Sequence, residues 1–482
     1  MKRTVVAILV SLVLAMPATA QRYVFPGKKT PAVCSKCLGK NAFGVPNKDL
    51  PTWPYDAPFL RHAGRFVDSS TTGNVQNAGL RTVRAGTVRV NRAKNRLYIT
   101  LGEAVGGYVL DTFFEERLGR PMIPVSGLPL GQTPTKRTPL ETVAKPDSLF
   151  YAESPFSGWV WSSVDIQRIL TDFDSDDRGF VYIGTYQLGW GITRDLSRLS
   201  GVAMEYVVQV QSTPHVANAV ISLKSGGKYY AVVSQNTVGA GRHTIFDVTK
   251  IPVPAAGPVQ LAARPAVTKP PAVNPVWSSK NSGIVTWAKS DARERLAILD
   301  TAGHVRIFDY AAFLSGAAPR ADFIPVSAAK AFVDLTFDEA GTLWIAEGPT
   351  PRYANPQNFN ALYRAKESGA GYTRETVDVF GGPFTPFKIS AAAGYVVVAG
   401  KAPDAKNVLG AELRLLNVTA TPKLVPTGPF IRNFYAAGPA GYADPGETVD
   451  TWAVTLVSQG AATYLLYSAG GLGDVFQLPN AN

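Results

Sequence analysis

The stretch DLTFDEAGTLWIAEG, from Asp334 to Gly348, decides how the rest of the chain is interpreted. It contains a hydrophobic segment, a short turn with Asp and Gly, and a second hydrophobic segment centred on Leu343, Trp344 and Ile345. Two apolar segments joined by such a turn are typical of a β-hairpin. The stretch therefore predicts two antiparallel strands, and it serves as a template for aligning the rest of the chain.

Similar strand–turn–strand segments recur and predict a repeat protein. They begin at Val88, Thr171, Ala219, Val276, Asp334, Lys388 and Tyr442. Most lie roughly 50 to 60 residues apart, a spacing at which each repeat forms one supersecondary unit. The first two are further apart because a segment rich in Pro, Gly and Thr, from Gly119 to about Pro146, separates them, and we interpret it as a long loop.

An aromatic residue follows the turn in six of the seven units, and the sixth unit has Val397 instead. The aromatic residues are Tyr98, Tyr182, Tyr230, Trp287, Trp344 and Trp452. A residue type that recurs at one position of a repeat indicates packing between neighbouring units. We therefore expect these rings to be buried between sheets and do not expect them to stack on a ligand.

A second hairpin follows the first in several units, most clearly at Leu296 to Tyr310 and at Ala462 to Leu478. Two hairpins per unit make a four-stranded meander, which is the blade of a β-propeller. The fold class predicted is therefore all-β, a β-propeller of seven four-stranded blades, with six or eight as alternatives. The final unit is interpreted as having four strands of its own, and whether a strand near Gly64 to Ser69 also closes the ring stays open.

The composition agrees with strands and turns, since the chain has 44 Gly, 36 Pro and only 17% charged residues. Residues 21–60 are rich in Pro and polar residues and are interpreted as an N-terminal extension. The predicted organisation is thus a signal peptide over residues 1–20, the extension over 21–60, and a single propeller domain over 61–482.

The signal peptide is predicted from MKRTVVAILVSLVLAMPATA, in which Lys2 and Arg3 precede an apolar run and Ala18-Thr19-Ala20 supplies small residues. The run is shorter than the ~20 apolar residues that span a bilayer. We therefore expect an exported protein, periplasmic or extracellular, with no membrane span.

The formal net charge of +12 raises the question of a nucleic-acid partner. The basic residues are scattered, however, and their densest groups are short and lie in tails, loops or turns, such as Lys28-Lys29 and Lys136-Arg137. A generally solvated surface is the better interpretation, and no nucleic-acid partner is expected.

The hairpin can be compared with a known family. Asp338, Gly341, Leu343, Trp344 and Ala346 match the D-x-x-G-x-L-W-x-A hairpin, so the stretch resembles those of NHL-repeat and SMP-30/gluconolactonase-like propellers. The resemblance concerns architecture, and its Asp and Gly serve the turn. It implies a propeller over about Val88 to Leu478 and carries no catalytic residue over to this chain.

Residues just before each hairpin are candidates for a shared site, because the innermost strands of a propeller begin at the central channel. They are Asp165, His215, Asn218, Lys280, Asn281, Asp334 and Lys388. The SMP-30-like enzymes hold a divalent metal in such a channel. By that analogy Asp165, Asn218, Asn281 and Asp334 are candidate metal ligands of a hydrolase or lactonase. Among the histidines, His215 in TPHVAN is the candidate base or ligand.

The densest acidic group is TDFDSDDRG, with Asp172, Asp174, Asp176 and Asp177. Alternating carboxylates can bind Ca²⁺, which prefers oxygen ligands. The EF-hand pattern fails because Asp177 stands where Gly is required. A polar hairpin turn is the simpler interpretation, and calcium is retained as the alternative cofactor, with Asp172, Asp174 and Asp176 as its ligands.

Cys34 and Cys37 are the two cysteines of the chain, and in an exported protein we expect them to form a disulfide. Haem attachment would need His where Leu38 stands. A zinc site would need a second pair of ligands. A redox role lacks the strand–helix setting that activates the C-x-x-C motif.

Of the four histidines, His243 and His304 are placed in turns, where we expect them to be exposed. The chain contains no G-x-S-x-G, H-E-x-x-H or P-loop motif, so serine-hydrolase, zincin and nucleotide-binding functions have no support. The leading expectation is a binding or interaction module for a protein, small-molecule or polysaccharide ligand. The alternative is the metal-dependent hydrolase or lactonase with its site at the channel mouth.

Overall fold

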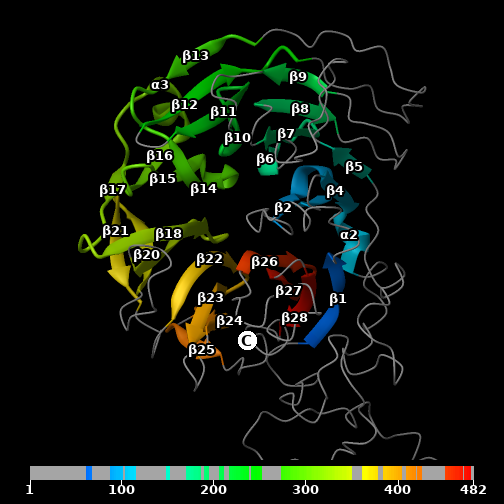
Figure 1. Ribbon diagram of the computed structural model, residues 1–482, viewed down its shortest axis with the longest axis vertical. Helices are drawn as coiled ribbons and strands as arrows, with labels where there is room; N and C mark the ends of the chain where they lie inside the picture. The colour runs from blue at the N-terminus through cyan, green and yellow to red at the C-terminus, as the bar shows by residue number, and fades with distance from the viewer. Residues whose placement is uncertain are drawn as a thin grey trace, which may run out of the picture.

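A computed structural model describes residues 61–67, 87–100, 104–114, 148–151, 170–185, 189–194, 206–210, 217–237, 240–251, 273–349, 361–377, 384–403, 409–419, 421–425, 451–469 and 472–478. These residues form seven four-stranded antiparallel sheets arranged around a central axis (Figure 1). The prediction of an all-β, seven-bladed propeller is confirmed. None of the helices among the described residues is long and apolar enough to cross a membrane.

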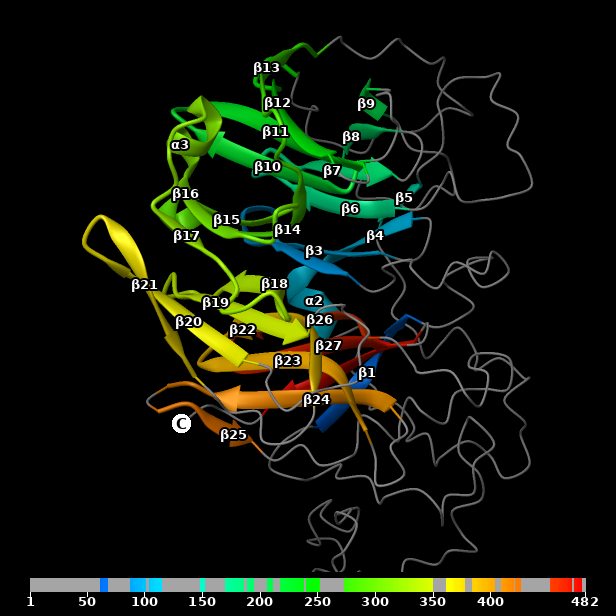
Figure 2. The same ribbon diagram turned by 60° about the vertical axis from the view of Figure 1, so that its left-hand side comes forward.

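Each of the first six sheets takes its four strands in chain order, from the innermost outward. The first three sheets are β2 (Val88–Asn91), β3 (Arg96–Thr100), β4 (Ala104–Val109) and β5 (Ser148–Tyr151); β6 (Leu170–Ser175), β7 (Phe180–Thr185), β8 (Trp190–Arg194) and β9 (Tyr206–Val210); and β10 (Ala219–Ser225), β11 (Lys228–Thr237), β12 (Ala240–Asp247) and β13 (Pro275–Ser278). The next three are β14 (Ile284–Ser290), β15 (Arg295–Asp300), β16 (Val305–Asp309) and β17 (Ala321–Phe323); β18 (Lys330–Phe337), β19 (Leu343–Pro349), β20 (Ala361–Ser368) and β21 (Gly371–Thr376); and β22 (Thr385–Ala392), β23 (Tyr395–Pro403), β24 (Leu409–Asn417) and β25 (Lys423–Val425). Figure 2 shows the hairpin of β20 and β21 projecting outward from the ring.

The seventh sheet is built from both ends of the described chain. Its inner strands are β26 (Thr451–Gln459), β27 (Ala462–Ala469) and β28 (Leu472–Leu478), and its outer strand is β1 (Arg61–Val67), which pairs antiparallel with β28. The interpretation of four strands within the final unit was therefore wrong, and the open question of ring closure is answered. The innermost strands also contact one another around the whole ring, including β26 with β2.

The predicted boundaries of two repeats were also wrong. The segment from Val276 is β13, the outer strand of the third sheet, followed by β14 of the fourth sheet. The seventh innermost strand, β26, begins at Thr451. Trp287 and Trp452 consequently lie on the first strands of their sheets and not on the second. An outer strand, a turn and the next inner strand look like a hairpin in sequence, because both connections have the same strand–turn–strand pattern.

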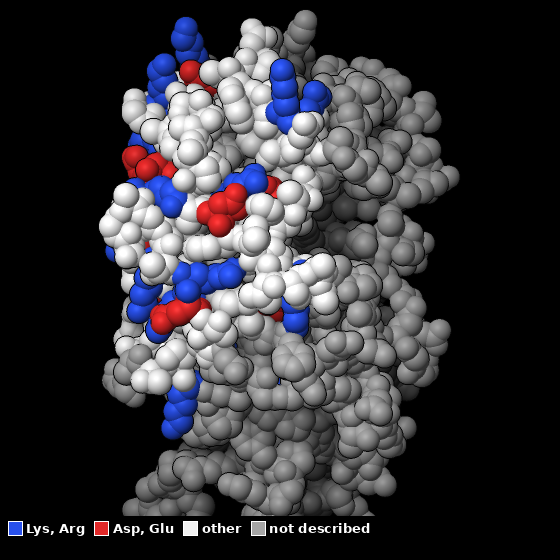
Figure 3. Space-filling view, turned by 90° about the vertical axis from the view of Figure 1, so that its left-hand side faces the viewer, with Lys and Arg blue, Asp and Glu red and all other residues white. Residues whose placement is uncertain are grey.

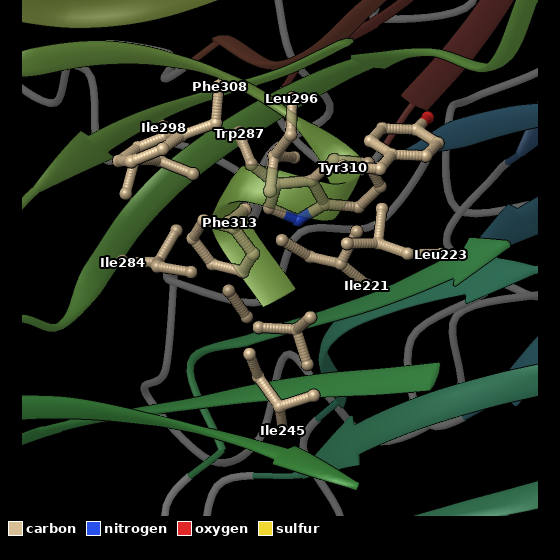
Figure 4. Packing of buried hydrophobic residues seen from close by; sticks show 12 residues of the cluster. Ile221, Leu223, Ile245, Ile284, Trp287, Leu296, Ile298, Phe308, Tyr310 and Phe313 are labelled. Carbon is tan, nitrogen blue, oxygen red and sulfur yellow. The ribbon is translucent and has the colours of Figure 1, made fainter. Parts of the chain in front are cut away.

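The hydrophobic core is divided into clusters between neighbouring sheets. Tyr98 of β3 packs against Phe173, Val181 and Ile183 of the second sheet. Tyr182 packs in the same way against the third sheet, Tyr230 against the fourth and Trp344 against the sixth. Figure 4 shows one such cluster, in which residues of β10 and β12 face those of β14, β15, β16 and α3 (Tyr310–Ser315). The expectation of rings buried between sheets is confirmed for Tyr98, Tyr182 and Trp344, whereas Tyr230 packs at the interface but is only half-buried.

The charged surface seen in Figure 3 carries basic and acidic side chains in small mixed groups. Ion pairs of the fourth and fifth sheets have the same mixed character. Arg306 lies between Asp300 and Asp322, and Glu367 contacts Arg295 and Arg320. Among the described residues of this face, these pairs place opposite charges side by side.

Candidate functional site

A cavity of about 330 Å³ lies in the central channel. Its wall comes from six of the seven innermost strands: β2, β6, β14, β18, β22 and β26. These strands surround the axis in Figure 1. The wall includes seven charged residues: Arg89, Asp172, Asp174, Lys289, Asp291, Asp334 and Lys388. In a chain with only 17% charged residues, this is a concentration of charge at one place.

Asp172 of β6 joins four sheets. Its Oδ1 lies 3.3 Å from the Arg89 guanidinium of β2, and its Oδ2 accepts hydrogen bonds from the Trp287 indole N–H at 2.6 Å and from the Val220 backbone N–H at 3.1 Å. The Arg89 guanidinium also lies 4.2 Å above the Trp287 ring, an arrangement in which the ring face attracts a cation. The carboxylate is buried and well supplied with donors.

Asp174, two residues further along β6, makes a second connection of the same kind. Its Oδ2 accepts hydrogen bonds from Lys289 Nζ at 2.7 Å, from the Ser222 backbone N–H at 2.8 Å and from the Ser222 hydroxyl at 2.9 Å. Burial of the Lys289 ammonium lowers its pKa, but the carboxylates of Asp174 and Asp291 outweigh this effect and hold the pKa above its ordinary value. The amine therefore stays charged.

The third sheet lies behind these connections. Trp287 and Lys289 both extend from β14 to β6, past β10, and Lys289 also donates to the Ser222 carbonyl of β10 at 3.1 Å. Among the described residues, β10 contributes none to the cavity wall. Trp287 and Lys289 of the fourth sheet therefore form the cavity wall where the innermost strand of the third sheet would otherwise do so.

Asp334 of β18 connects the fourth, fifth and sixth sheets. Its Oδ1 accepts a hydrogen bond from the Thr286 hydroxyl at 3.1 Å and lies 3.6 Å from Lys388 Nζ. Its Oδ2 accepts a hydrogen bond from the Ile389 backbone N–H at 3.0 Å. In the next sheet, the Ser390 hydroxyl accepts from the Leu456 backbone N–H at 2.9 Å. Side chains of one innermost strand thus bind the backbone of the next.

The residues predicted from their position before each hairpin are only partly brought together. Asp334 and Lys388 line the cavity. Asn218 lies directly before β10 and its backbone N–H donates to the Ser234 carbonyl, while Lys280 and Asn281 are exposed between β13 and β14. These three are not among the cavity-lining residues. Asp165 and His215 lie outside the described residues, as do Cys34 and Cys37.

The three candidate calcium ligands have different partners. Asp172 and Asp174 make the contacts given above, whereas Asp176 belongs to the hairpin turn. Its carboxylate accepts from the backbone N–H groups of Arg178 and Phe180 and from the Tyr182 hydroxyl, and it pairs with the Arg178 guanidinium at 2.8 Å. Within the described part of the chain, no group of three or more His, Cys, Asp or Glu side chains is arranged to hold a metal ion. Calcium binding stays a prediction.

Arg89 and Lys289 are site residues that sequence reasoning missed. Each is a charged residue on a mainly apolar innermost strand, in VRVN and IVTWAKS. A charged residue among apolar residues of an innermost strand indicates a position that lines the channel. For Lys289 this indication can be used only when β14 is recognised as the first strand of its sheet.

The prediction of an exposed His243 was wrong. This residue lies within β12, is 4% exposed, and stacks against Phe313 with ring centroids 5.0 Å apart. Its Nδ1 lies 2.9 Å from the Ser282 carbonyl oxygen. The preceding GAGR resembles a turn in sequence, but Ala240 and Gly241 begin the strand, and Gly241 allows close approach of Gly283.

No protein-family model and no curated protein sequence matches the chain. Among solved structures, the β-propeller domain of Myceliophteria thermophila Cps50 (Swd1) is 10% identical, with a TM-score of 0.45 over 81% of this chain and 96% of that one. The N-terminal domain of Nup159 is 8% identical, with a TM-score of 0.44 over 87% and 95% of the two chains. Saccharomyces cerevisiae Sqt1 is 7% identical, with a TM-score of 0.44 over 82% and 83%. Similarities this low say nothing about what this chain binds.

Proposed function

We propose that this propeller is an exported binding module and that its ligand site is the cavity in the central channel. The observation that carries the proposal is the cavity itself, with a volume of about 330 Å³ and charged side chains from several separate sheets. Ligand pockets typically measure about 300 to 1,000 Å³ and contain a few polar groups that fix the ligand's orientation. A small molecule, or the end of an extended chain, fits this volume, whereas a folded protein does not.

The sequence supports the remaining parts of the proposal. The charged start, apolar run and Ala18-Thr19-Ala20 of the first 20 residues support export to the periplasm or the cell exterior, with a mature chain that begins near Gln21. The D-x-x-G-x-L-W-x-A hairpin supports a propeller of the NHL-repeat or SMP-30/gluconolactonase-like type. Mass spectrometry of the exported chain tests the first point, and a mature protein that retains Met1 to Ala20 contradicts it.

A large side chain introduced into the cavity tests whether the cavity is the ligand site. Thr455 is a half-buried residue of the cavity wall, so Thr455→Trp places a large ring in the cavity. Thr373 lies exposed on the outer strand β21, and Thr373→Trp is the matched control. Compounds that raise the melting temperature of the parent protein should lose this effect in Thr455→Trp and keep it in Thr373→Trp.

The test requires that both variants fold, which their own melting temperatures and circular dichroism spectra establish. Ligands that bind Thr455→Trp as tightly as the parent place the binding site elsewhere on the propeller and overturn the proposal. The same assay with added divalent metals and with lactone substrates tests the hydrolase alternative, for which Asp334 is the predicted ligand that lines the cavity.

A further inference from the structure

Five of the seven innermost strands carry a β-bulge near their start. The residues that follow the bulges are Asp172 of β6, Thr286 of β14, Asp334 of β18, Lys388 of β22 and Ala453 of β26. All five line the cavity, whereas β10, which pairs with β11 without a bulge, contributes none of its described residues to the wall. A bulge redirects the side chains that follow it. The bulges therefore define one level of the channel wall.

Equivalent positions lie at corresponding heights on β18, β22 and β26, which are neighbours around the axis (Figure 1). Asp334, the first residue after its bulge, accepts from the backbone N–H of Ile389, the second residue after the next bulge. Ser390, the third residue after its bulge, accepts from the backbone N–H of Leu456, the fourth residue after the next one. Both contacts have the same offset of one residue. Residues at equal distances from their bulges therefore lie at the same level of the channel.

The third residue after the bulge carries a hydroxyl group on all three of these strands: Thr336, Ser390 and Thr455. All three residues line the cavity. They lie on the same face of their strands as the first residues after the bulges, roughly 7 Å further along the strand. The channel thus has a second level, at which three adjacent strands carry hydroxyl groups.

The hydroxyl groups of this second level have hydrogen-bonding capacity left. Within the part of the chain that the structure describes, the Thr455 hydroxyl makes no hydrogen bond, and the Thr336 hydroxyl makes a long one of 3.4 Å to the Phe337 carbonyl oxygen. The Ser390 oxygen accepts one hydrogen bond from Leu456, and its O–H group is left to donate. Because a hydroxyl can both donate and accept, these groups are matched to the hydroxyl groups of a polyol.

The charges of the wall do not favour a charged ligand. Each charged side chain lies within 3.9 Å of an opposite charge, in the groups Arg89 with Asp172, Lys388 with Asp334, and Lys289 with both Asp174 and Asp291. Asp291, the one carboxylate in excess in this set, is 69% exposed, but the Tyr310 hydroxyl also donates to it, at 2.7 Å. A charged ligand would therefore meet both signs of charge side by side, or would have to displace hydrogen bonds that connect the sheets.

We propose that the channel binds an uncharged polyhydroxylated compound, a free sugar or the end of a saccharide chain, through the hydroxyl groups of Thr336, Ser390 and Thr455. This inference rests on the proposed function, in which the cavity is the ligand site. Apolar residues of the same strands, among them Leu335 and Ala391, also line the cavity and are suited to the C–H groups of a sugar ring. A neutral ligand requires no counter-charge, so its affinity should not depend on the salt concentration.

Isothermal titration calorimetry on the full mature chain tests the ligand class. The neutral probes are glucose, galactose, mannose, maltose and cellobiose. Glucuronate and glucosamine are the charged probes, and cyclohexanol offers a ring with a single hydroxyl. We expect at least one neutral sugar to bind more tightly than these three, with an affinity that is unchanged between low and high salt. Tighter binding of a disaccharide than of its monosaccharide unit indicates the end of a saccharide chain, and the reverse indicates a free sugar.

Substitutions that remove one hydroxyl test the residues. Thr455→Val and Thr336→Val nearly keep the shape of the side chain and should each weaken sugar binding by about two- to tenfold, the effect of losing one hydrogen bond. Thr373→Val removes an exposed hydroxyl from the outer strand β21 and is the matched control, which should bind as the parent does. Ser390 is left unchanged because its oxygen also accepts from the backbone of β26. The melting temperature of each variant shows whether it folds.

The outcomes separate the inference from the function on which it rests. Preferential binding of glucuronate, glucosamine or cyclohexanol that Thr455→Trp blocks overturns the polyol inference and leaves the channel as the ligand site. Sugar binding that Thr455→Trp does not affect overturns both. Binding of none of the five neutral sugars, or equal affinities in Thr455→Val, Thr336→Val and Thr373→Val, also overturns the polyol inference.

Discussion

Single aspartates hold three of the hairpin turns among the described residues. In the segments that begin at Asp176, Asp300 and Asp338, the sequence D-x-x-G ends in a glycine with positive φ: Gly179, Gly303 and Gly341. In each case the aspartate side chain accepts backbone N–H groups of the turn. Asp338, which belongs to the hairpin compared with a known family, thus serves its turn in the same way as Asp176 and Asp300 do in other sheets.

Asp176 and Asp177 offer a comparison of two neighbouring carboxylates. Asp176→Ala should destabilise the protein by about 3 kcal/mol or more, because it leaves the buried Arg178 guanidinium without the carboxylate that balances its charge. Asp177→Ala removes a largely exposed pair with Lys224 and should cost about 1 kcal/mol or less. Urea unfolding of both variants measures the difference. Equal losses, or a calcium-dependent stability that Asp176→Ala abolishes, would contradict the role of Asp176 in the turn.

His243 should make stability depend on pH. Burial lowers the pKa of His243 below its ordinary value, so the unfolded chain binds a proton more readily than the folded chain does. The stability contributed by the neutral ring is present above about pH 6.5, the ordinary value for His, and is lost as the pH falls below it. His243→Phe keeps a ring against Trp277 and Phe313 and should flatten this dependence. Urea unfolding between pH 5 and pH 8 measures it, and an unchanged slope would count against this assignment.

At the scale of elements, the innermost strands are held together by side chains that bind the backbone of the next strand. Asp172, Asp174, Asp334 and Ser390 each accept a backbone N–H from the following sheet. All four also lie in the wall of the cavity. The arrangement explains why acidic residues near the channel are poor guides to a metal site, since most of their lone pairs are already used within the fold.

The Lys289–Asp174 pair is the clearest case to test at this scale. Lys289→Met leaves the buried Asp174 carboxylate without its cation and should cost about 3 to 5 kcal/mol. Asp174→Asn in the same chain removes that charge and should restore part of the loss, because an amide oxygen can still accept from Ser222. A double-mutant cycle by urea unfolding measures the coupling. Additive losses would show that the pair does not hold β14 to β6.

Strand β14 shows most clearly which features of the fold and the site can be predicted from the sequence. The hairpin pattern predicted the fold class and the number of sheets, because turn chemistry and apolar strands are local properties. It assigned the start of the fourth sheet incorrectly. VWSS is β13 of the third sheet, but together with the following turn and β14 it has the same local pattern as a hairpin. A better alignment was present in the sequence: NRAKNRL from Asn91 and SDARERL from Ser290 both form a short 3-10 turn that ends in a residue with positive φ. The site was harder to predict, because Arg89, Asp172 and Trp287 meet only through the closed ring.

At the scale of the whole molecule, the contact that closes the ring joins the two ends of the described chain. β1 completes the last sheet by pairing with β28, so the ring closes through residues separated by most of the sequence. In a closed propeller the sheets support one another around the ring, and the edges that remain are short and protected. Loss of β1 would expose the edge of β28, and exposed edges promote aggregation.

Deletion and permutation of β1 test this closure. A chain that begins at residue 68 should lose about 3 kcal/mol or more, since each lost backbone hydrogen bond contributes about 0.5 to 1.5 kcal/mol, whereas a chain that begins at Arg61 keeps the strand and is its matched control. In the antiparallel pair Arg61 lies opposite Gln477, so the start of β1 is beside the end of β28. The last four residues, Pro479 to Asn482, are long enough for a hairpin loop between them. A permuted chain that begins at residue 68 and carries residues 61–67 after Asn482 should therefore recover the stability. Urea unfolding compares the three chains, and a permuted chain as unstable as the deletion would contradict closure by β1.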